Sequence, residues 1–417
     1  MSKGARYLQR YADTGLNRLD EIISIQRGVI SDHIHLIASA CYPFSTVLRA
    51  MAEPSFLLPA EGMPGERYLP GAQVMDLVET EGEQLALKLF GTPSGYRASL
   101  QPHSGTQANQ IVYNAILQPA DVVLCLNAKN GGHISHSVLI SRRHRTFNYG
   151  LTSDGLIDYA HLEALAAAHK PKLIIVGGSA LPRQIDFALC GRIAREHDAF
   201  LHADISHTAT FIAAGLHAPV LPHCDFVTFN TSKNLRGPNS GIVLFREEHT
   251  ERVYRSVFPT TQGGANEPGM LAKFAALLEW SRRDIKAYAT NIVRTSRWLS
   301  EALIERQVRL VTGGTDCHLL LLDLSGHPMT GAEFERKFED HGILLNRNLI
   351  PGDLRSPMHT SGLRVGTTNL TILDYEHADV RRLGHCIADL IDGLELDACM
   401  IRGLLEKYPE PRDWFST

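Results

Sequence analysis

The stretch "FVTFNTSKNLRGPNSGIVLF", Phe226–Phe245, carries the pattern that decides the fold. Its two ends, Phe226–Thr231 and Gly241–Phe245, are short apolar runs of the kind that forms buried strands. The segment between them contains Gly, Pro and small polar residues, which indicates a loop. Lys233 lies near the start of this loop, where the first strand ends. Because lysines are mostly exposed in folded proteins, Lys233 is either a solvated surface charge or a nucleophile held at a site.

Similar apolar runs occur earlier in the chain, with helical patterns between several of them. The strand-like runs are Val122–Leu126, Leu173–Val176 and Phe200–Ile205. The helical patterns are Thr106–Leu117, Tyr159–His169 and Cys190–His197. Short apolar strands that alternate with helices predict an α/β fold with a mostly parallel sheet covered on both faces. Such sheets bind their ligands at the carboxyl ends of the strands.

The flanking regions predict further parts of the molecule. Residues 1–70 are expected to form an N-terminal helical arm and an interface loop, and residues 71–270 the large domain. A long helical pattern over Leu271–Arg306 predicts a bridging helix. After it, strand-like runs such as "VRLVTGG" and "CHLLLLDL" predict a smaller C-terminal α/β domain of residues 307–417.

The composition excludes several classes of protein. The 417 residues are 44% hydrophobic and 21% charged, with a formal net charge of -4 and no long run of like charge, so no nucleic-acid partner is expected. Seven dispersed cysteines without a C-x-x-C pair favour a reducing compartment. We find no signal-peptide core and no apolar stretch of ~18 residues, so we expect a cytoplasmic protein without a membrane partner.

The stretch "QPHSGTQANQIVYNAIL", Gln101–Leu117, predicts a loop that opens into a helix. Ser104, Gly105 and Thr106 lie at this junction. Free backbone N–H groups and the positive end of the helix dipole can hold a phosphate there. The alternative is that Ser104 simply caps the helix.

Two further stretches carry candidate site residues. In "HADISH", Asp204 ends an apolar strand, and its charge needs a partner such as a protonated ring nitrogen, or else it caps nearby backbone. In "NGGHISHS", His133 follows two glycines, where it can stack on a flat ligand or be a core histidine. His136, His202 and His207 are further ligand types, but no tight ligand spacing occurs, so no metal site is predicted.

The order of these elements points to pyridoxal 5'-phosphate. A phosphate loop, a ring-stacking residue, a buried aspartate and a lysine 29 positions later (233 − 204) are the parts that hold this cofactor. The amine of Lys233 would form a Schiff base with the cofactor's aldehyde. Asp204 would keep the pyridine nitrogen protonated, which makes the ring an electron sink.

At this point the chain closely resembles the serine hydroxymethyltransferase family. Eleven blocks follow in the family's order over residues 20–395, among them "HIHLIASACYP", "AEGMPGERY", "QPHSGTQAN", "FLHADISHTATFIAAGLHAPV", "KNLRGP" and "TSGLRVGT". The resemblance implies a fold-type I pyridoxal-phosphate enzyme with a mostly parallel seven-stranded sheet. It also implies a homodimer or a dimer of dimers, with active sites shared at the subunit interface.

The resemblance assigns a cofactor site. Lys233 matches the Schiff-base lysine, Asp204 the partner of the pyridinium nitrogen, and His133 the residue that stacks on the ring. The remaining cofactor positions are Ser104, Gly105 and Thr106 at the phosphate, Gly264 from the neighbouring subunit, and Ser179 and His207 beside the cofactor's hydroxyl.

The resemblance also assigns a substrate site. Arg364 would grip the carboxylate of the amino acid as a two-pronged donor, with Ser39 nearby. Glu61 matches the carboxylate that moves protons during aldol cleavage, and it would reach the site across the interface. Tyr68 and Asn348 match positions near the substrate or the folate.

The chain departs from the family pattern around the pocket lining. The departures are Ala40-Cys41 for a Glu-Asn pair, Pro59 and Leu69 for two tyrosines, Ser232 for a histidine, Asn239 for an arginine, and Phe211 at the end of "SHTATF" for the usual "AHxAGL". Each lost phenol removes a hydrogen bond worth ~1–3 kcal/mol to a buried anion.

The expected reaction breaks or forms the Cα–Cβ bond of a β-hydroxy amino acid, in its ordinary form serine and tetrahydrofolate to glycine and methylenetetrahydrofolate. Glu61, or a water that it holds, would take the hydroxyl proton. The departures leave open a specialised relative that acts on threonine, α-methylserine or another aldehyde acceptor. A third hypothesis is a non-catalytic family member, against which the retained Lys233, Asp204 and Glu61 argue.

Overall fold

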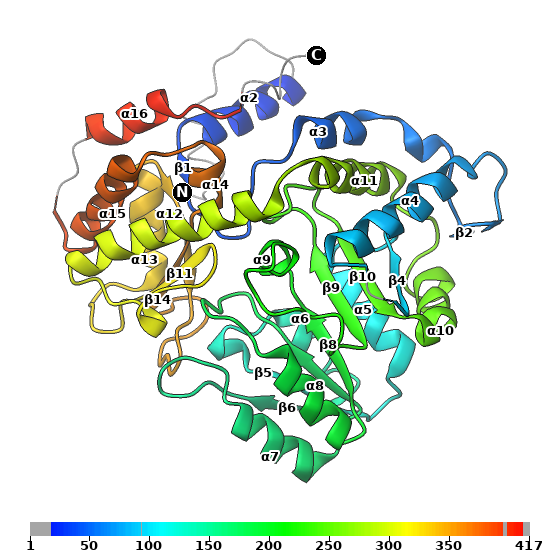
Figure 1. Cartoon of the computed structure of the whole chain (residues 1–417). Coiled ribbons are helices and arrows are strands. Elements are labelled where there is room, and N and C mark those ends of the chain that lie inside the picture. Colours follow the sequence, from blue (N-terminus) through cyan, green and yellow to red (C-terminus); the bar gives the residue numbers. More distant parts are fainter. Residues whose placement is uncertain (1–17, 93, 395–397, 412–417) are drawn as a thin grey trace.

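The computed structural model describes residues 18–92, 94–394 and 398–411, so residues 1–17 of the expected N-terminal arm lie outside the described part. Its largest element is a seven-stranded sheet with the order β4-β10-β9-β8-β7-β5-β6 (Figure 1). The strands are β4 (Tyr96–Ser99), β5 (Val122–Leu126), β6 (Arg145–Tyr149), β7 (Leu173–Val176), β8 (Phe200–Asp204), β9 (Phe226–Asn230) and β10 (Gly241–Arg246). Only β10 runs against its neighbours in this sheet, while β9, β8, β7, β5 and β6 pair in parallel. The predicted α/β fold with a mostly parallel sheet is therefore confirmed.

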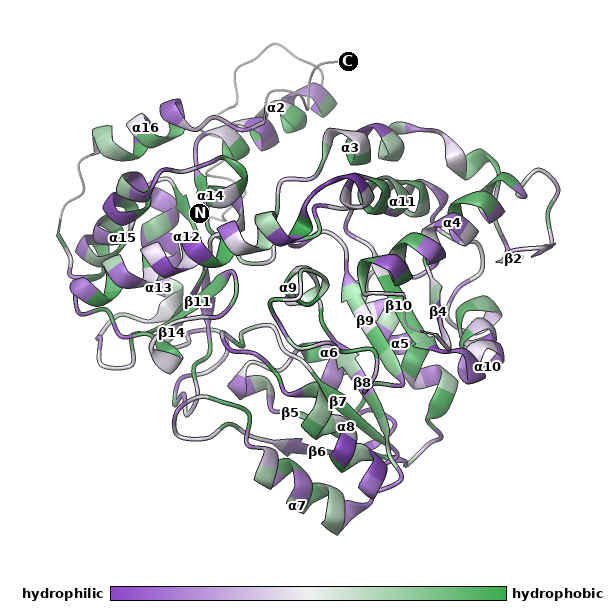
Figure 2. Ribbon diagram, in the orientation of Figure 1, coloured by the Kyte–Doolittle hydropathy of each residue, from purple (hydrophilic) through white to green (hydrophobic). Residues whose placement is uncertain are grey.

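Helices cover both faces of this sheet because its strands are apolar on both sides (Figure 2). On one face, Val123 and Ile175 pack in a core with α5 (Gly105–Ile116) and α10 (Thr250–Arg255). On the other face, alternate side chains such as Leu124 pack in a second core. That core also contains residues of α7 (Tyr159–His169), α8 (Phe187–Glu196) and α11 (Glu267–Arg282). A fully buried side chain of this kind contributes roughly 1.5–3 kcal/mol to folding.

A smaller antiparallel sheet, in the order β11-β14-β13, forms the C-terminal part of the molecule. Its strands are β11 (Leu319–Asp323), β13 (Asn346–Asn348) and β14 (Gly362–Gly366), and its helices are α12 (Ile285–Glu305), α13 (Gly331–Asp340), α14 (Thr368–Ile372), α15 (His377–Ile391) and α16 (Ala398–Lys407). The N-terminal segment joins this part, since β1 (Ile34–His35), which follows α2 (Arg18–Ser31), pairs in parallel with β12 (Ile343–Leu344). Ile34 shares a core there with Leu404. The exact domain boundaries stay a prediction.

The prediction of a single bridging helix over residues 271–306 is wrong. The structure has two helices there, α11 and α12, and α12 runs along the upper part of Figure 1 between the two sheets. The break occurs because Arg283 is extended (φ -116°, ψ 155°) and the Asp284 side chain accepts a hydrogen bond from the Ala287 backbone N–H at 2.9 Å. Asp is a poor residue for a helix interior and a good N-cap, so the helix restarts at this position.

The strand expected from "VRLVTGG" is also largely wrong. The stretch forms a turn at Val311–Gly313 with one isolated bridge, between Leu310 and Leu322. Thr312 and Gly313 have positive φ angles of 66° and 64°, which a strand cannot accommodate. The pattern also missed β4 and β6, which are the two edges of the large sheet.

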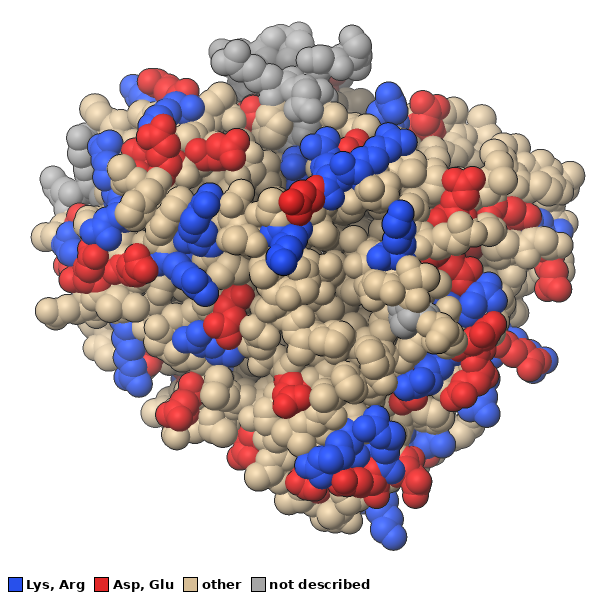
Figure 3. Space-filling model, viewed as in Figure 1, with Lys and Arg blue, Asp and Glu red and all other residues tan. Residues whose placement is uncertain are grey.

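The N-terminal half carries a helical and hairpin region beside the large sheet. It comprises α3 (Ser45–Ala52), the short turn η1 (Ser55–Leu57), the hairpin of β2 (Gly62–Met63) and β3 (Glu66–Arg67), and α4 (Val74–Leu89). On the face shown in Figure 3, acidic and basic side chains are interspersed. Among the described residues, no helix is long and apolar enough to cross a membrane.

Candidate active site

A pocket of about 1010 Å³, including its open mouth, lies at the carboxyl ends of the parallel strands. The sequence-predicted residues that line it are Ser39, Gly105, Thr106, His133, Ser179, Asp204, His207, Lys233, Asn348 and Arg364. Each of the segments after β5, β7, β8 and β9 contributes to this lining, and β13 and β14 of the small sheet close the other side. Segments that are far apart in the sequence therefore meet where a doubly wound sheet is expected to bind its ligand.

Asp204 is the last residue of β8, and four hydrogen bonds hold its carboxylate. Oδ2 accepts from His136 Nε2 at 3.0 Å and from Asn109 Nδ2 at 2.8 Å. Oδ1 accepts from the Ser206 backbone N–H at 3.0 Å and from the Ser206 hydroxyl at 2.6 Å. Burial alone would raise the pKa of Asp204, but the hydrogen bond and charge of His136 and the charge of Lys233 hold it well below its usual range. Asp204 is thus a fixed, ionised carboxylate.

Lys233 lies three residues beyond β9, with its amine in the pocket. Burial lowers the pKa of this amine to about 8, although the nearby charge of Asp204 acts in the opposite direction. An amine with a lowered pKa is deprotonated more often, which makes it a better nucleophile. Of the two interpretations given by the sequence, the structure supports the lysine held at a site, since Lys233 lines the pocket and is only partly exposed.

His133 caps the short helix α6 (Ile134–Ser137) at the pocket, where its Nδ1 accepts from the Ser135 backbone N–H at 3.2 Å. Burial lowers the pKa of His133 to about 4, so the ring is neutral near pH 7. The residue before it must be glycine, because a Cβ at Gly132 would lie 2.2 Å from the Leu126 carbonyl oxygen. The backbone therefore brings the ring of His133 close to the end of β5.

The N-terminus of α5 forms one end of the pocket. Ser104 caps this helix, since its hydroxyl accepts from the Gln107 backbone N–H at 3.0 Å, so the capping interpretation of Ser104 is confirmed. Gly105 and Thr106 follow and line the pocket. An added Cβ at Gly105 would lie 3.3 Å from Asn230 Cβ, so the strand end and the helix start are in close contact. The cap by Ser104 satisfies the N–H of Gln107, and the other N–H groups of the first turn have no partner within the helix.

Arg364 on β14 is buried and faces the pocket from the small sheet. Its Nη1 donates to the Ser179 carbonyl at 2.6 Å and its Nε donates to Asn346 Oδ1 at 3.2 Å. Burial lowers the pKa of the guanidinium to about 10. Among the described residues, no carboxylate pairs with it. A buried cation without an anionic partner is costly, so this position favours an anionic ligand.

His207 lies in the loop after β8 and stacks on His318, with ring centroids 5.3 Å apart and planes at 10°. The Ala38 carbonyl can only accept, so His318 Nε2, which lies 3.0 Å from it, carries a proton. His207 Nδ1 lies 3.2 Å from the same nitrogen and must then accept. Burial keeps the pKa of His207 well below its usual range, so the neutral ring carries its proton on Nε2.

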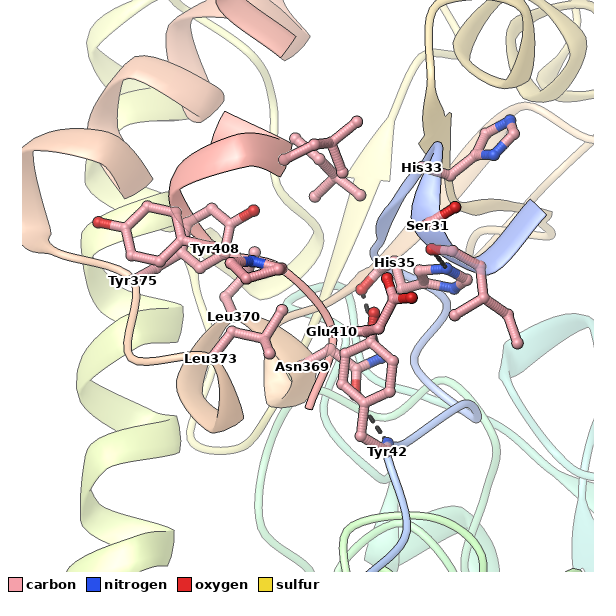
Figure 4. A pocket seen from close by; sticks show the side chains of 14 residues that line it. Ser31, His33, His35, Tyr42, Asn369, Leu370, Leu373, Tyr375, Tyr408 and Glu410 are labelled. Atoms are coloured by element: carbon pink, nitrogen blue, oxygen red, sulfur yellow. Dashed lines mark hydrogen bonds between the residues drawn. The ribbon is translucent and has the colours of Figure 1, made fainter. Parts of the chain in front are cut away.

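The loop that carries Ser39 is held by α14. The Asn369 side chain accepts from the Tyr42 backbone N–H at 3.0 Å and donates to the Ala40 carbonyl at 3.2 Å. Figure 4 shows Tyr42 and Asn369 beside a small pocket where the segment up to Glu410 packs against β1. Arg236 of the Lys233 loop also donates to the Tyr42 carbonyl, at 2.9 Å. This loop is therefore tied to both parts of the molecule.

Four predicted site residues do not line this pocket in the described chain. Ser104 lies just before the lining residue Gly105, as the cap of α5, whereas Glu61, Tyr68 and Gly264 belong to another region. They lie near one another instead, because an added Cβ at Gly264 would be 3.9 Å from Glu61 Cγ, and the Tyr68 backbone N–H donates to the Glu61 carbonyl at 3.2 Å. The buried Arg67 holds this turn through hydrogen bonds from its Nη1 to the carbonyls of Gly62 (2.6 Å) and Ala60 (3.3 Å). Glu61 thus lies directly before the β2–β3 hairpin and outside the lining of its own chain's pocket.

Several residues of the site were missed by sequence reasoning. Asn109 and His136 hydrogen-bond to Asp204 from segments 95 and 68 positions away, and Ser206 does so from two positions away. Asn230 lines the pocket and accepts from the Ser232 backbone N–H at 2.7 Å. Asn109 could have been predicted from the sequence, because it lies one helical turn after Gly105 and therefore on the same face of the helix.

Ligand atoms of His133, His136 and Asp204 lie within 4.8 Å of one another. The sequence predicted no metal site because the spacing of these residues is loose. The oxygen and nitrogen atoms that would face a metal are already bonded to each other, since His136 Nε2 donates to Asp204 Oδ2. The cluster is therefore a hydrogen-bonded pair, His136 and Asp204, beside the neutral ring of His133.

The sheet topology, the lysine and aspartate at the strand ends and the helix N-terminus at the pocket together define the fold-type I class of enzymes. Comparison with known proteins then gives the family. The family model described as serine hydroxymethyltransferase matches residues 14–387. The chain belongs to the serine hydroxymethyltransferase family.

Curated relatives match the chain over most of its length. It is 40% identical over 364 residues to serine hydroxymethyltransferase of Polynucleobacter necessarius, covering 87% of each chain. It is 39% identical over 363 residues to that of Bordetella avium, covering 86% of each chain, and 39% identical over 379 residues to that of Cupriavidus taiwanensis, covering 90% of each. The names of these relatives favour the ordinary reaction over the specialised alternatives.

Proposed function

We propose that this protein is a pyridoxal-phosphate-dependent hydroxymethyltransferase that interconverts serine and glycine with tetrahydrofolate as the one-carbon carrier. The observation that carries the proposal is the meeting of three charged groups of low exposure, Lys233, Asp204 and Arg364, in one pocket at the strand ends. Membership of the family and the names of the relatives support the same reaction. Its compartment would be the cytoplasm, in keeping with seven cysteines that form no disulfide.

The donor set of the pocket fits pyridoxal phosphate. Lys233 offers an amine of lowered pKa, Asp204 an ionised carboxylate for a ring N–H, and His133 a neutral ring. Gly105 and Thr106 at the start of α5 would hold the phosphate, with Ser179 and His207 beside the ring hydroxyl. When bound, the cofactor supplies an aldehyde that reacts with amines and a protonated ring that accepts the electrons of a breaking bond.

The protein's own residues orient the amino acid and move its protons. Arg364 would bind the carboxylate of serine, which supplies the anionic partner that its guanidinium lacks. The four hydrogen bonds on Asp204 keep it ionised, so it can hold a proton on the ring nitrogen. Glu61 would take the proton of the serine hydroxyl as a general base. Asn348 and Tyr68 would contact the substrate or the folate.

The position of Glu61 supports a dimer with shared sites. Residues 51–77, at the upper right of Figure 1, expose a run of large apolar side chains. Phe56 is 61% exposed, Leu57 69% and Tyr68 71%. A contiguous apolar surface next to a functional residue favours contact with another protein surface. We propose a second copy of this chain there, which brings Glu61, Tyr68 and Gly264 to the neighbour's pocket, as a homodimer or a pair of such dimers.

Borohydride reduction followed by peptide mapping tests the cofactor, and turnover tests the reaction. Reduction of the protein with pyridoxal phosphate should label the peptide that contains Lys233, and Lys233→Ala should carry no label there. Serine cleavage should be fast only with tetrahydrofolate. No label on Lys233 in the wild-type protein would overturn the cofactor assignment. Faster cleavage of threonine without folate would favour a specialised relative instead.

A further inference from the structure

Lys273 on α11 is a buried cation that takes no part in the reaction steps above. Its side chain is 1% exposed, and its Nζ donates to the carbonyls of Leu100, Pro102 (3.0 Å) and Gly241 (3.0 Å). All three donors of the ammonium group are thus used on backbone oxygens. Among the described residues, no carboxylate forms an ion pair with it. Burial lowers the pKa of Lys273 to about 7, while the charge of Glu79 acts in the opposite direction.

The three carbonyls belong to the two segments that shape the start of α5. Leu100 and Pro102 lie in the loop between β4 and α5, and Gly241 begins β10. The two segments are in direct contact, because the Gly241 backbone N–H donates to the Pro102 carbonyl at 3.2 Å. A Cβ at Gly241 would lie 2.3 Å from the Ser104 carbonyl oxygen. Lys273 therefore anchors the loop that ends at Ser104, the cap of the pocket helix.

Of the described residues that line the α5 end of the pocket, none is a lysine or an arginine. The lysine and arginine that line the pocket are Lys233 and Arg364, and Arg364 comes from the small sheet. Beside Gly105 stands Asn230, whose Nδ2 donates to Asn239 Oδ1 at 3.1 Å. An anion at this end would meet backbone N–H groups and neutral side chains. In its protonated form, Lys273 places a buried positive charge directly behind the same loop.

We propose that Lys273 is a positioning residue for the phosphate of the cofactor. It fixes the loop of residues 100–104, so that the first turn of α5 presents its free N–H groups in one arrangement. Its charge, in a low-dielectric interior, also favours an anion at that end. The inference deepens the proposed function and rests on it, since it assumes that pyridoxal phosphate binds in this pocket.

A comparison of two vitamin B6 aldehydes tests this role. Wild-type, Lys273→Met and the matched control Lys286→Met, an exposed lysine on α12, are stripped of cofactor. Each is titrated with pyridoxal phosphate and with pyridoxal, which has the aldehyde and ring but no phosphate, and binding is followed by visible absorbance. Lys273→Met should weaken the binding of pyridoxal phosphate about tenfold or more and that of pyridoxal less than about threefold. Lys286→Met should match the wild type with both aldehydes.

The outcomes separate this inference from the proposed function. If both aldehydes lose affinity equally in Lys273→Met, the residue is merely structural and the inference fails. An unchanged affinity for pyridoxal phosphate also overturns it. If the wild type binds neither aldehyde at Lys233, the proposed cofactor fails and this inference falls with it. If Lys273→Met does not fold, Lys273→Gln is measured instead, because glutamine keeps an N–H donor but has no charge. It is judged in the same way, by the loss of affinity for pyridoxal phosphate relative to the loss of affinity for pyridoxal.

Discussion

Arg364 donates hydrogen bonds to two neutral groups, the Ser179 carbonyl and the Asn346 side chain. It has no carboxylate partner among the described residues. A guanidinium in this state is held in orientation by Ser179 and Asn346 while its charge stays uncompensated. The fork of N–H groups that an arginine offers a carboxylate cannot be replaced by the single ammonium of lysine. The residue is therefore suited to select amino acids by their α-carboxylate.

Arg364→Lys should raise the KM for serine about 100-fold, because a bidentate, charge-assisted pair is worth roughly 1.5–3 kcal/mol per bond. Steady-state kinetics with varied serine measures the effect. The matched control is Arg347→Lys on the same small sheet, where the side chain pairs with Glu335 at 2.9 Å outside the pocket lining. An equal rise in both variants would mean that Arg364 does not contact the substrate.

The reaction of Lys233 with its cofactor should depend on pH in the physiological range. With its pKa at about 8, about a tenth of the amine is neutral at pH 7, against well under a thousandth for an ordinary lysine. The neutral amine is the reactive form, so the rate of covalent capture of pyridoxal phosphate should rise about tenfold from pH 6 to pH 7 and level off above pH 8. Stopped-flow absorbance on the cofactor-free protein follows this rate. A rate that still rises tenfold between pH 9 and pH 10 would contradict it.

At the scale of single residues, the sequence reveals the acidic and basic side chains of the site. It does not reveal which residues form hydrogen bonds with them. Lys233 and Asp204 each follow a recognisable apolar strand, so their placement at the sheet edge could be derived. Asn109 and His136 were missed as partners of Asp204 because long-range packing, and no local pattern, brings them to it. Glu61 and Gly264 could be assigned only through family resemblance, since their own chain keeps them out of the pocket.

At the scale of elements, burial decided which strands could be predicted. The central strands β5, β7, β8 and β9 are covered on both faces and are continuous apolar runs, which the sequence shows directly. The edge strands β4 and β6 read "YRAS" and "RTFNY" and have partly exposed positions, so they carry no comparable run. A strand at a sheet edge needs fewer apolar residues, because one side of it lies open to solvent.

The break between α11 and α12 yields a stability prediction. Asp284→Ala removes the cap on the Ala287 N–H and should lower the free energy of unfolding by about 1 kcal/mol. Asp284→Ser keeps an accepting oxygen and should stay within a few tenths of a kcal/mol of the wild type. Urea denaturation of both variants measures the difference. If both variants lose the same stability, the cap does not cause the restart of the helix.

At the scale of the whole molecule, the separation of Lys233 and Glu61 predicts complementation between inactive chains. Lys233→Ala and Glu61→Gln should each be nearly inactive alone. Mixed and refolded in equal amounts, they should regain about a quarter of wild-type activity, because half of the dimers are mixed and each has one intact site. Activity after mixing, with each variant refolded alone as the control, measures this. No recovery in proven mixed dimers would show that Glu61 serves its own chain.

The hydrophobic core of the C-terminal part, here called the small core, joins residues from opposite ends of the described chain. This constrains the order of folding. Ile34 and Leu36 lie in it together with Leu404 and Tyr408. During synthesis on the ribosome, every strand of the large sheet has been made once residue 246 emerges. The early residues of the small core must wait longer, because their first partners in that core begin at Leu299, and Ile34 pairs with Ile343. Until then they stay exposed to water and to chaperones, which bind such apolar segments in incomplete chains.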